Sequence, residues 1–384
     1  MPYIVVTVSD KTPIQIKLED LICGPVDLSR FFEQPKKKNF TETRTYYRER
    51  DKVPFKILNS VDFIEITDKL VAFVDEHKDL YDVENRHDLY HTFKIPKKSG
   101  GLRTINAPNE DLEAALRQLK TIFERDCRAL YHNCAYAYIS GRATLDNIKK
   151  HQRNDSYWFL KTDFSDFFGS TTKEFILKQL GLIFPFNFIL ETERGRTALE
   201  KCIDLCMLDG GLPQGTPISP TLTNIVMIPI DAQLNKSLSK DNYVYTRYAD
   251  DIIISCKHDF LHEKMVQRID ACLESFGAPF KIKPTKTHYG SRCGQNWGLG
   301  VMLNKDNKIT IGWRNTQRFN AMCNSFILDM KNGIAWQLED INHFNGLISY
   351  YKMVEEDKIK NIINHYNTKY NVNMMKMIRE ALRG

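Results

Sequence analysis

The sequence has no long apolar run, no signal-like start and no low-complexity tract, and each absence excludes a class of protein. No apolar run reaches the ~18–20 residues that a membrane helix needs, so a membrane-spanning protein is not expected. The first ten residues, MPYIVVTVSD, lack the basic-then-apolar pattern of a secretory signal. Because low-complexity tracts and internal repeats are also missing, we do not expect an extended disordered chain.

The cysteines lack any paired arrangement. Nine are spread along the chain, an odd number, with no CxxC motif and no metal-ligand spacing. They indicate reduced core thiols of a cytoplasmic protein rather than disulfides or a zinc site. The formal net charge is only +6 over 384 residues, which fits a polyanionic partner but does not require one.

Apolar periodicity predicts a mixture of hairpins and helices, with two or three domains for a chain of this length. Alternation predicts hairpins over residues 3–21, 93–108 and 298–312, the last turning at Asp306–Asn307. Helical spacing predicts helices over residues 61–80 and 111–131, and a mostly helical chain follows Trp313. The fold class is therefore α+β.

A basic, aromatic stretch lies between the first hairpin and the first helix. Charge and base stacking in such a stretch can grip single-stranded nucleic acid, although a solvated connector is an alternative. Its residues are Lys36, Lys37, Lys38, Arg44, Arg48 and Arg50, with Tyr46 and Tyr47 among them.

The segment YVYTRYADDIIISC (243–256) has two adjacent carboxylates, Asp250 and Asp251, between apolar strands. Two close carboxylates repel each other unless a cation neutralises them. An isolated pair would indicate a solvent-exposed turn, since Asp is a common turn former. Here the flanking strands are apolar enough to be buried, so the pair at their bend predicts a site for hard divalent cations.

A third carboxylate supports this interpretation. The segment YWFLKTDFSDFFGST (157–171) predicts a strand over Trp158–Lys161 that runs into Asp163. If this strand neighbours the Asp250–Asp251 bend, the three carboxylates would hold two Mg²⁺ ions, which prefer oxygen ligands. Two such ions stabilise the attacking and leaving oxygens of an in-line phosphoryl displacement. The sequence therefore predicts a phosphoryl-transfer enzyme.

Four segments occur in the order and approximate spacing found in reverse transcriptases. They are LKTDFSDFF (160–168), GLPQGTPISPTLTNI (211–225), YTRYADDIIIS (245–255) and KIKPTKTHYG (281–290). Over roughly residues 90–310 the chain resembles the prokaryotic reverse transcriptases of the retron, group II intron-like and antiviral defence-associated group. This resemblance implies that Asp163, Asp250 and Asp251 are the catalytic, metal-binding carboxylates, with the Phe164 backbone carbonyl as a further ligand.

The same resemblance implies a set of nucleotide-binding residues in the first two segments. Asp166 matches the family's nucleotide-site acid, and Gln214 matches the residue that contacts the incoming nucleotide. Phe168 matches the bulky residue beneath the nucleotide sugar, where an aromatic ring leaves no room for a 2′-hydroxyl. Deoxynucleotides would therefore be preferred.

Three cations complete the implied nucleotide site. In KIPKKSGGLRTI (94–105), Lys97 and Arg103 match the cations of the family's fingers hairpin, and both suit phosphate oxygens. Lys98 is an equally basic neighbour of Lys97. Lys286 matches a Lys that protonates the leaving pyrophosphate, a role that requires its pKa to be brought down toward neutrality.

The resemblance implies a right-hand polymerase with an N-terminal extension (1–89), fingers and an antiparallel-sheet palm (90–312) and a helical thumb (313–384). We expect an RNA-directed DNA polymerase that uses two Mg²⁺ ions, for which Mn²⁺ can substitute. It would make cDNA from dNTPs on a dedicated non-coding RNA template, in cytoplasmic antiphage defence. An effector protein or a second copy of the chain would be a further partner, and no membrane is expected.

Several alternatives stay open, and two segments depart from the retron pattern. Trp297-Gly298-Leu299-Gly300 stands where retron enzymes carry Val-Thr-Gly, and AYAYISGRATLDNIKKHQ (135–152) is closer to group II-like enzymes. A template-independent or protein-primed DNA polymerase of the same family remains an alternative. Phe168 argues against an RNA-dependent RNA polymerase. The intact carboxylates and Gln214 argue against a non-catalytic RNA-binding scaffold. No maturation or endonuclease segment is recognised after the thumb, so an intron-mobility protein is not expected.

Overall fold

The computed structural model divides the chain into two compact units. Unit 1 comprises residues 1–142, 162–252 and 261–287, and unit 2 comprises residues 143–161, 253–260 and 288–384. The described residues are 63–97, 100–127, 131–293, 297–298 and 300–383, together with the backbone of four short strands before residue 56. None of the helices in these segments combines the length and hydropathy required to cross a lipid bilayer.

Two hairpins represent the N-terminal segment. Strand β1 (Tyr3–Thr7) pairs antiparallel with β2 (Pro13–Lys17), which confirms a hairpin within the predicted residues 3–21. Strand β3 (Tyr46–Tyr47) pairs with β4 (Pro54–Phe55). The basic side chains of residues 36–50 lie outside the described residues.

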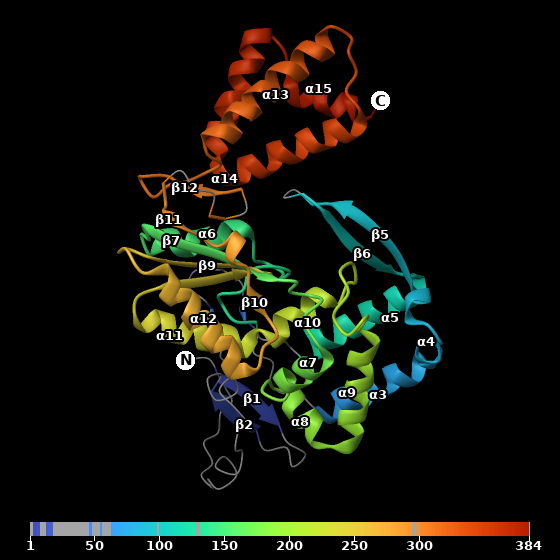
Figure 1. Ribbon diagram of the computed structural model, residues 1–384. Coiled ribbons are helices and arrows are strands. Elements are labelled where there is room, and N and C mark those ends of the chain that lie inside the picture. Colours follow the sequence, from blue (N-terminus) through green and yellow to red (C-terminus); the bar gives the residue numbers. More distant parts are fainter. Residues whose placement is uncertain are drawn as a thin grey trace. The chain divides into compact units, whose positions relative to one another are not determined.

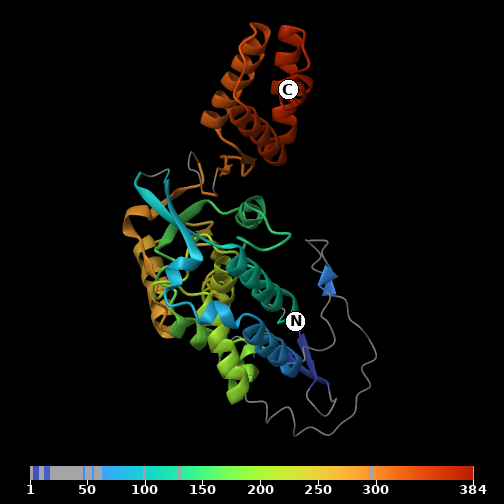
Figure 2. The ribbon, with the colours of Figure 1, turned by 90° about the vertical axis from the view of Figure 1, so that its right-hand side faces the viewer.

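Unit 1 is built mainly from helices (Figures 1 and 2). Its helices are α3 (Phe63–Glu76), α4 (Lys78–Tyr81), α5 (Glu110–Thr121), α7 (Lys173–Leu180), α8 (Phe186–Glu191), α9 (Glu193–Leu205), α10 (Ser219–Val226), α11 (Ile228–Lys240) and α12 (His262–Phe276). Helix α3 buries Ile66, Leu70 and Phe73, and it lies beside α8 and α9 in both views. Cys202 and Cys206 are buried and unpaired by disulfides, as predicted.

A long hairpin extends from the helices of unit 1 (Figure 1). Strands β5 (Tyr90–Pro96) and β6 (Leu102–Pro108) pair antiparallel, with Ile95 opposite Arg103. Helix α5 follows, and the Asn109 side chain caps it by accepting a hydrogen bond from the Leu112 N–H at 2.9 Å. One π-helical turn (Ile122–Asp126) then continues the predicted helix.

A five-stranded sheet carries the acidic segments. Strands β10 (Lys281–Ile282), β7 (Trp158–Ser165), β9 (Asp251–Cys256) and β8 (Val244–Tyr248) lie in that order. Strand β11 (His288–Ser291) also pairs with β7, and both β10 and β11 run antiparallel to it. Strand β7 extends four residues beyond the predicted Trp158–Lys161, so Asp163 lies within it. The predicted neighbourhood of β7 and the Asp250–Asp251 bend is confirmed.

Unit 2 contains the Trp297–Gly300 segment that departs from the retron pattern. The Trp297 ring is buried and stacks on Phe159 at 5.3 Å between centroids. A Cβ at Gly298 would lie 2.2 Å from Ile148 of helix α6 (Thr144–Arg153), so no larger residue fits there without movement. The two segments that depart from the retron pattern therefore pack against each other.

The C-terminal part of unit 2 is a hairpin followed by three helices. Strands β12 (Met302–Leu303) and β13 (Ile309–Thr310) pair antiparallel around the predicted turn, where Asn304 Oδ1 accepts two backbone hydrogen bonds. Helices α13 (Trp313–Lys331), α14 (Leu338–Tyr370) and α15 (Met374–Ala381) form one bundle (Figure 1). Phe319, Phe326 and Phe344 are fully buried in its core. The mostly helical chain predicted after Trp313 is confirmed.

Candidate functional site

Backbone hydrogen bonds fix the Asp250–Asp251 bend to strand β7. Ala249 adopts φ 56°, a left-handed conformation that turns the chain between β8 and β9. The Phe164 N–H donates to the Asp250 carbonyl at 3.3 Å, and the Lys283 N–H donates to the Asp163 carbonyl at 2.9 Å. Asp163 on β7 is thus held between the bend on one side and the segment leading to Lys286 on the other.

The three carboxylates are within electrostatic reach of one another, with Lys286 among them. Asp163 is buried, 2% exposed, and the Lys286 Nζ donates to its Oδ2. Burial raises the pKa of the Asp250 carboxyl, and the Asp251 and Asp163 carboxylates act in the same direction. The hydrogen bond to Asp163 raises the pKa of Lys286, and the charges of Asp250 and Asp251 act in the same direction. This is the opposite of the lowering toward neutrality that the expected proton-donor role requires. The structure therefore brings together the three predicted catalytic residues and Lys286.

The donor set fits a divalent cation. Asp163 Oδ1 is buried and has no hydrogen-bond partner among the described residues, so one ligand oxygen is left over. Carboxylate oxygens are the ligands that Mg²⁺ prefers. Within the described segments, no set of three or more His, Cys, Asp and Glu side chains already has metal-site geometry. The Lys286 ammonium supplies the positive charge that the carboxylates need in this arrangement.

A cluster of phenylalanines lies beneath the acidic strand and fixes the next segment. The Phe164 and Phe167 rings stack at 5.5 Å between centroids, and Phe280 contacts both. The half-buried Phe168 ring packs edge-on against Phe167 at 5.7 Å. Its backbone carbonyl accepts hydrogen bonds from two N–H groups, so Phe168 is anchored through both ring and main chain.

Asp166 forms the turn between the strand and this anchored residue. It adopts φ 45°, a conformation that Asp tolerates better than most residues. Its carboxylate lies over Gly169, where an added Cβ would be only 2.5 Å from Asp166 Oδ2. The side chain is exposed and remains available to a ligand.

The GLPQG loop (211–215) is locked between the Phe168 turn and the β5–β6 hairpin. The Leu212 N–H donates to the Phe168 carbonyl at 3.1 Å. The Gln214 carbonyl accepts from the Asn106 N–H of β6 at 2.7 Å, and the Gln214 side chain is half-buried. Gly215 has φ 119° and approaches Asn106 so closely that a Cβ would lie 2.8 Å from its carbonyl oxygen. The Phe168 turn, the GLPQG loop and the β5–β6 hairpin therefore form one connected assembly.

We expect Gly211→Ala to disturb this assembly through steric overlap alone. A Cβ at Gly211 would lie 2.0 Å from the Gly169 carbonyl oxygen, so the two loops must separate. Overpacking of this kind costs about 1–3 kcal/mol, and displacement of the Phe168 turn should raise the KM for dNTP. Thermal denaturation and steady-state primer extension measure both effects.

Gly210→Ala is the matched control for this substitution. Gly210 has φ 79° but no atom within 4 Å of an added Cβ, so the variant introduces backbone strain without a clash. It should lower stability and leave the KM for dNTP unchanged. Equal KM values in the wild type and Gly211→Ala would contradict the steric argument.

The cations of the hairpin differ in their relation to the carboxylates. Tyr138 lies within electrostatic reach of both Arg103 and the acidic bend. Partial burial raises the pKa of the Tyr138 phenol, the Asp250 carboxylate also raises it, and the Arg103 guanidinium lowers it. Arg103 thus lies within electrostatic reach of the same tyrosine as Asp250. Lys97 is exposed at the hairpin turn, where its N–H donates to the Gly101 carbonyl at 2.9 Å. No contact in the described residues connects Lys97 with the carboxylates, so its role stays a prediction.

Tyr138 is a further candidate residue of the functional site, and no sequence motif identified it. It is 56% exposed and adopts φ 57°, an uncommon conformation for an aromatic residue. Its loop is fixed because the Asn224 side chain donates to the Ala137 carbonyl at 2.8 Å. The only sequence signal was its place next to the Gly141-Arg142 segment, which did not distinguish it from its neighbours.

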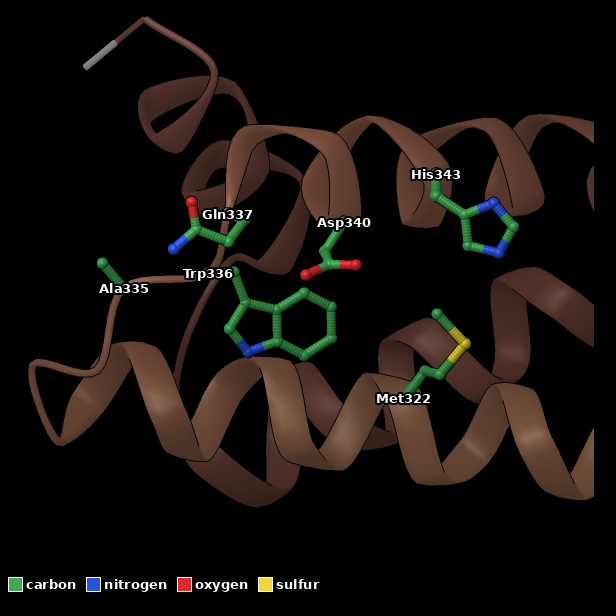
Figure 3. A pocket seen from close by; sticks show the side chains of 6 residues that line it. All are labelled: Met322, Ala335, Trp336, Gln337, Asp340 and His343. Atoms are coloured by element: carbon green, nitrogen blue, oxygen red, sulfur yellow. The ribbon is translucent and has the colours of Figure 1, made fainter. Parts of the chain in front are cut away.

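A pocket of about 350 Å³ lies in unit 2 (Figure 3). Figure 3 shows Met322 coming from α13, and Asp340 and His343 from α14, around the indole of Trp336. The Trp336 Nε1–H donates to Asp329 Oδ2 at 2.9 Å, which holds the ring. None of the predicted site residues lines this pocket.

Comparison with known proteins agrees with the motifs. Residues 95–311 match the reverse transcriptase (RNA-dependent DNA polymerase) family. Retron Ec83 reverse transcriptase of Escherichia coli is 30% identical over 311 residues, 77% of this chain and 91% of that protein. Retron Mx162 reverse transcriptase of Myxococcus xanthus is 27% identical over 290 residues, 70% of this chain and 58% of that protein. A solved structure of Candida albicans telomerase with a fragment of telomeric RNA aligns at a TM-score of 0.43 and 14% identity, over 84% of this chain and 60% of that chain.

The matched family covers more than half of the chain and includes the acidic strands, the GLPQG loop and Lys286. The resemblance inferred from four short segments is confirmed, and so is the α+β polymerase fold class. The chain belongs to the reverse transcriptase family, whose members are RNA-directed DNA polymerases.

Proposed function

We propose that this reverse transcriptase uses two-metal phosphoryl transfer at Asp163, Asp250 and Asp251 to make cDNA on a dedicated non-coding RNA. The observation that carries the proposal is the convergence of the three carboxylates on neighbouring strands, with a buried, unpartnered oxygen on Asp163. The Phe164 carbonyl is a further proposed ligand. When bound, Mg²⁺, or Mn²⁺ in its place, neutralises charge on the attacking and leaving oxygens.

The remaining motif residues bind and orient the nucleotide in this proposal. Phe168 presents its anchored ring to the sugar, and Asp166 and Gln214 flank it on connected loops. Arg103 and Lys97 take the triphosphate, for which a guanidinium fork and an ammonium are both suited. Lys286 would first have to leave Asp163, whose hydrogen bond raises its pKa, and would then deliver a proton to the departing pyrophosphate.

The proposed domain assignment rests on the same resemblance to reverse transcriptases. We assign residues 1–89 to an N-terminal extension, 90–312 to fingers and palm, and 313–384 to a helical thumb. Helix α14 carries the exposed Lys360 and Lys369 and the half-buried Lys352, whose charges suit the phosphates of a template–product duplex. Similarity to retron enzymes supports a role in cytoplasmic antiphage defence, with an effector protein or a second copy of the chain as a further partner.

Sequencing the nucleic acid that co-purifies with the protein, before and after adding dNTPs and Mg²⁺, tests this proposal. We expect one enriched RNA species, and a new DNA complementary to part of it. Pre-treatment with ribonuclease should abolish that DNA. The double variant Asp250→Ala/Asp251→Ala should retain the RNA and make no DNA. DNA synthesis that is unaffected by ribonuclease would instead indicate template-independent polymerisation.

A further inference from the structure

A fully buried ion pair lies behind the acidic bend and has no part in the chemistry described so far. Arg247 of β8 and Asp231 of α11 are each 0% exposed. The guanidinium donates three hydrogen bonds to the carboxylate, at 2.8–3.2 Å, and the Tyr245 hydroxyl donates a fourth at 2.8 Å. Replacing such a pair by apolar residues is often neutral or stabilising, so stability alone does not explain the charges.

The remaining guanidinium nitrogen reaches the catalytic bend. Arg247 Nη1 donates to the Ala249 carbonyl at 3.0 Å and to Asn224 Oδ1 at 3.1 Å. Ala249 is the left-handed residue immediately before Asp250, and that conformation costs a non-glycine residue about 1–2 kcal/mol. A charged donor on its carbonyl offsets this cost and fixes the direction in which the chain enters the acidic pair.

Arg247 is held through its main chain as well as its side chain. Its backbone N–H donates to the Cys134 carbonyl at 2.8 Å, and its backbone carbonyl accepts from the Tyr136 N–H at 2.9 Å. The Asn224 side chain accepts from Arg247 Nη1 through its Oδ1 and donates to the Ala137 carbonyl through its Nδ2. Helices α10 and α11, strand β8 and the 134–137 segment therefore meet at Arg247, whose side chain touches the bend.

We propose that Arg247 is a positioning residue, which holds the Ala249 carbonyl so that Asp250 and Asp251 face Asp163. The inference rests on the proposed function of these carboxylates. Misplacing reacting groups by about 1 Å can cost about a hundredfold in rate, even when the altered residue touches no substrate. Loss of this contact should therefore lower kcat and metal affinity, because both depend on the arrangement of the carboxylates.

The triple variant Arg247→Met/Asp231→Leu/Tyr245→Phe separates positioning from stability. It removes both charges and the Tyr245 hydroxyl, so no buried charge is left unpaired, and only the Asn224 Oδ1 and Ala249 acceptors lose a donor. We therefore expect the variant to fold with a modestly lower melting temperature. We expect kcat for primed RNA-templated synthesis to fall about 10–100-fold. Mn²⁺ affinity, measured by electron paramagnetic resonance without substrate, should fall several-fold, while KM for dNTP changes little.

Two further variants, one at Arg247 and one control at another ion pair, test the positioning role independently of the triple variant. Arg247→Lys retains the charge, but one ammonium cannot reproduce the fork to Asp231 and Ala249, so it should also lower kcat. This variant decides the question if the triple variant does not fold. Arg268→Met/Asp241→Leu removes an exposed Arg–Asp pair of 2.7 Å in unit 1 and should change neither kcat nor Mn²⁺ affinity.

Unchanged kcat and Mn²⁺ affinity in folded Arg247 variants would overturn the inference and leave the proposed function intact. A wild-type protein that neither binds Mn²⁺ nor extends a primer would instead refute the proposed function. Parallel losses in the Arg268→Met/Asp241→Leu control would indicate a general effect of removing ion pairs, which also overturns the inference.

Discussion

Asp163→Asn should reduce DNA synthesis by about a thousandfold or more. The substitution preserves the shape of a buried side chain but removes its negative charge, the property that a divalent cation and Lys286 both require. Stabilisation of transition-state charge by a metal ion contributes several kcal/mol, and each 1.4 kcal/mol changes the rate tenfold. Single-turnover extension of a primed RNA template with Mg²⁺ measures the effect.

A matched acid elsewhere in the chain separates this effect from a general loss of charge. Asp155 precedes β7, is 64% exposed in its side chain and pairs with Arg292 at 2.7 Å. Asp155→Asn should leave the rate unchanged because Asp155 is exposed and the Asn amide oxygen can still accept from Arg292, whose side chain is 11% exposed. The amount of co-purifying RNA should be the same for both variants. An Asp163→Asn enzyme within tenfold of the wild-type rate would refute the metal-binding role of this residue.

The acidic bend could be predicted from the sequence because its signals are local. Apolar runs on both sides of Asp250–Asp251 fix two strands, and the turn between them follows from the chain reversal. The hairpin at Asp306–Asn307 is equally local, since the Asn304 side chain closes the turn on its own neighbours. Periodicity alone could not show that Asp163 lies beside the bend. The order of the four segments, which resembles that of reverse transcriptases, indicated this neighbourhood.

The contacts that support the site could not be predicted in this way. Arg247 and Asp231 are 16 residues apart, and nothing in the alternation of β8 indicates that an arginine is fully buried there. Lys286 and Asp163 are 123 residues apart, and their contact depends on the pairing of β10 with β7. Such pairs depend on tertiary packing, which the local pattern of polar and apolar residues does not encode.

Long-range interactions also explain where the helices depart from their sequence pattern. Helix α14 is interrupted at Glu355, which has φ −139° and ψ 68°. Its carboxylate accepts hydrogen bonds from the Thr310 hydroxyl and the Ile311 N–H, each at 2.8 Å, so the interruption coincides with a tertiary contact. The helix predicted over residues 61–80 similarly divides into α3 and α4 at His77, whose Nε2 lies 2.7 Å from Gln118 Oε1 of α5.

Phe168→Ala should weaken the preference for deoxynucleotides over ribonucleotides by about a hundredfold, roughly the discrimination that a pocket can exert on one added hydroxyl. The wild-type ring is held against Phe167, and its backbone carbonyl accepts from the Leu212 N–H, so it cannot easily move aside for a 2′-hydroxyl. Removing the ring opens that space without touching the carboxylates. The ratio of kcat/KM for dNTP to that for rNTP on the same primed RNA measures the change.

Phe168→Tyr is the control because it keeps a ring of the same width, so it should retain the wild-type ratio. Phe167→Ala is unsuitable, since Phe167 is 3% exposed and its loss would disturb the cluster that supports the whole strand. Phe168→Ala should keep most of its rate with dNTP, because the three carboxylates remain in place. If the folded variant discriminates as strongly as the wild type, the sugar does not lie against Phe168, and selection must come from another residue of the connected loops.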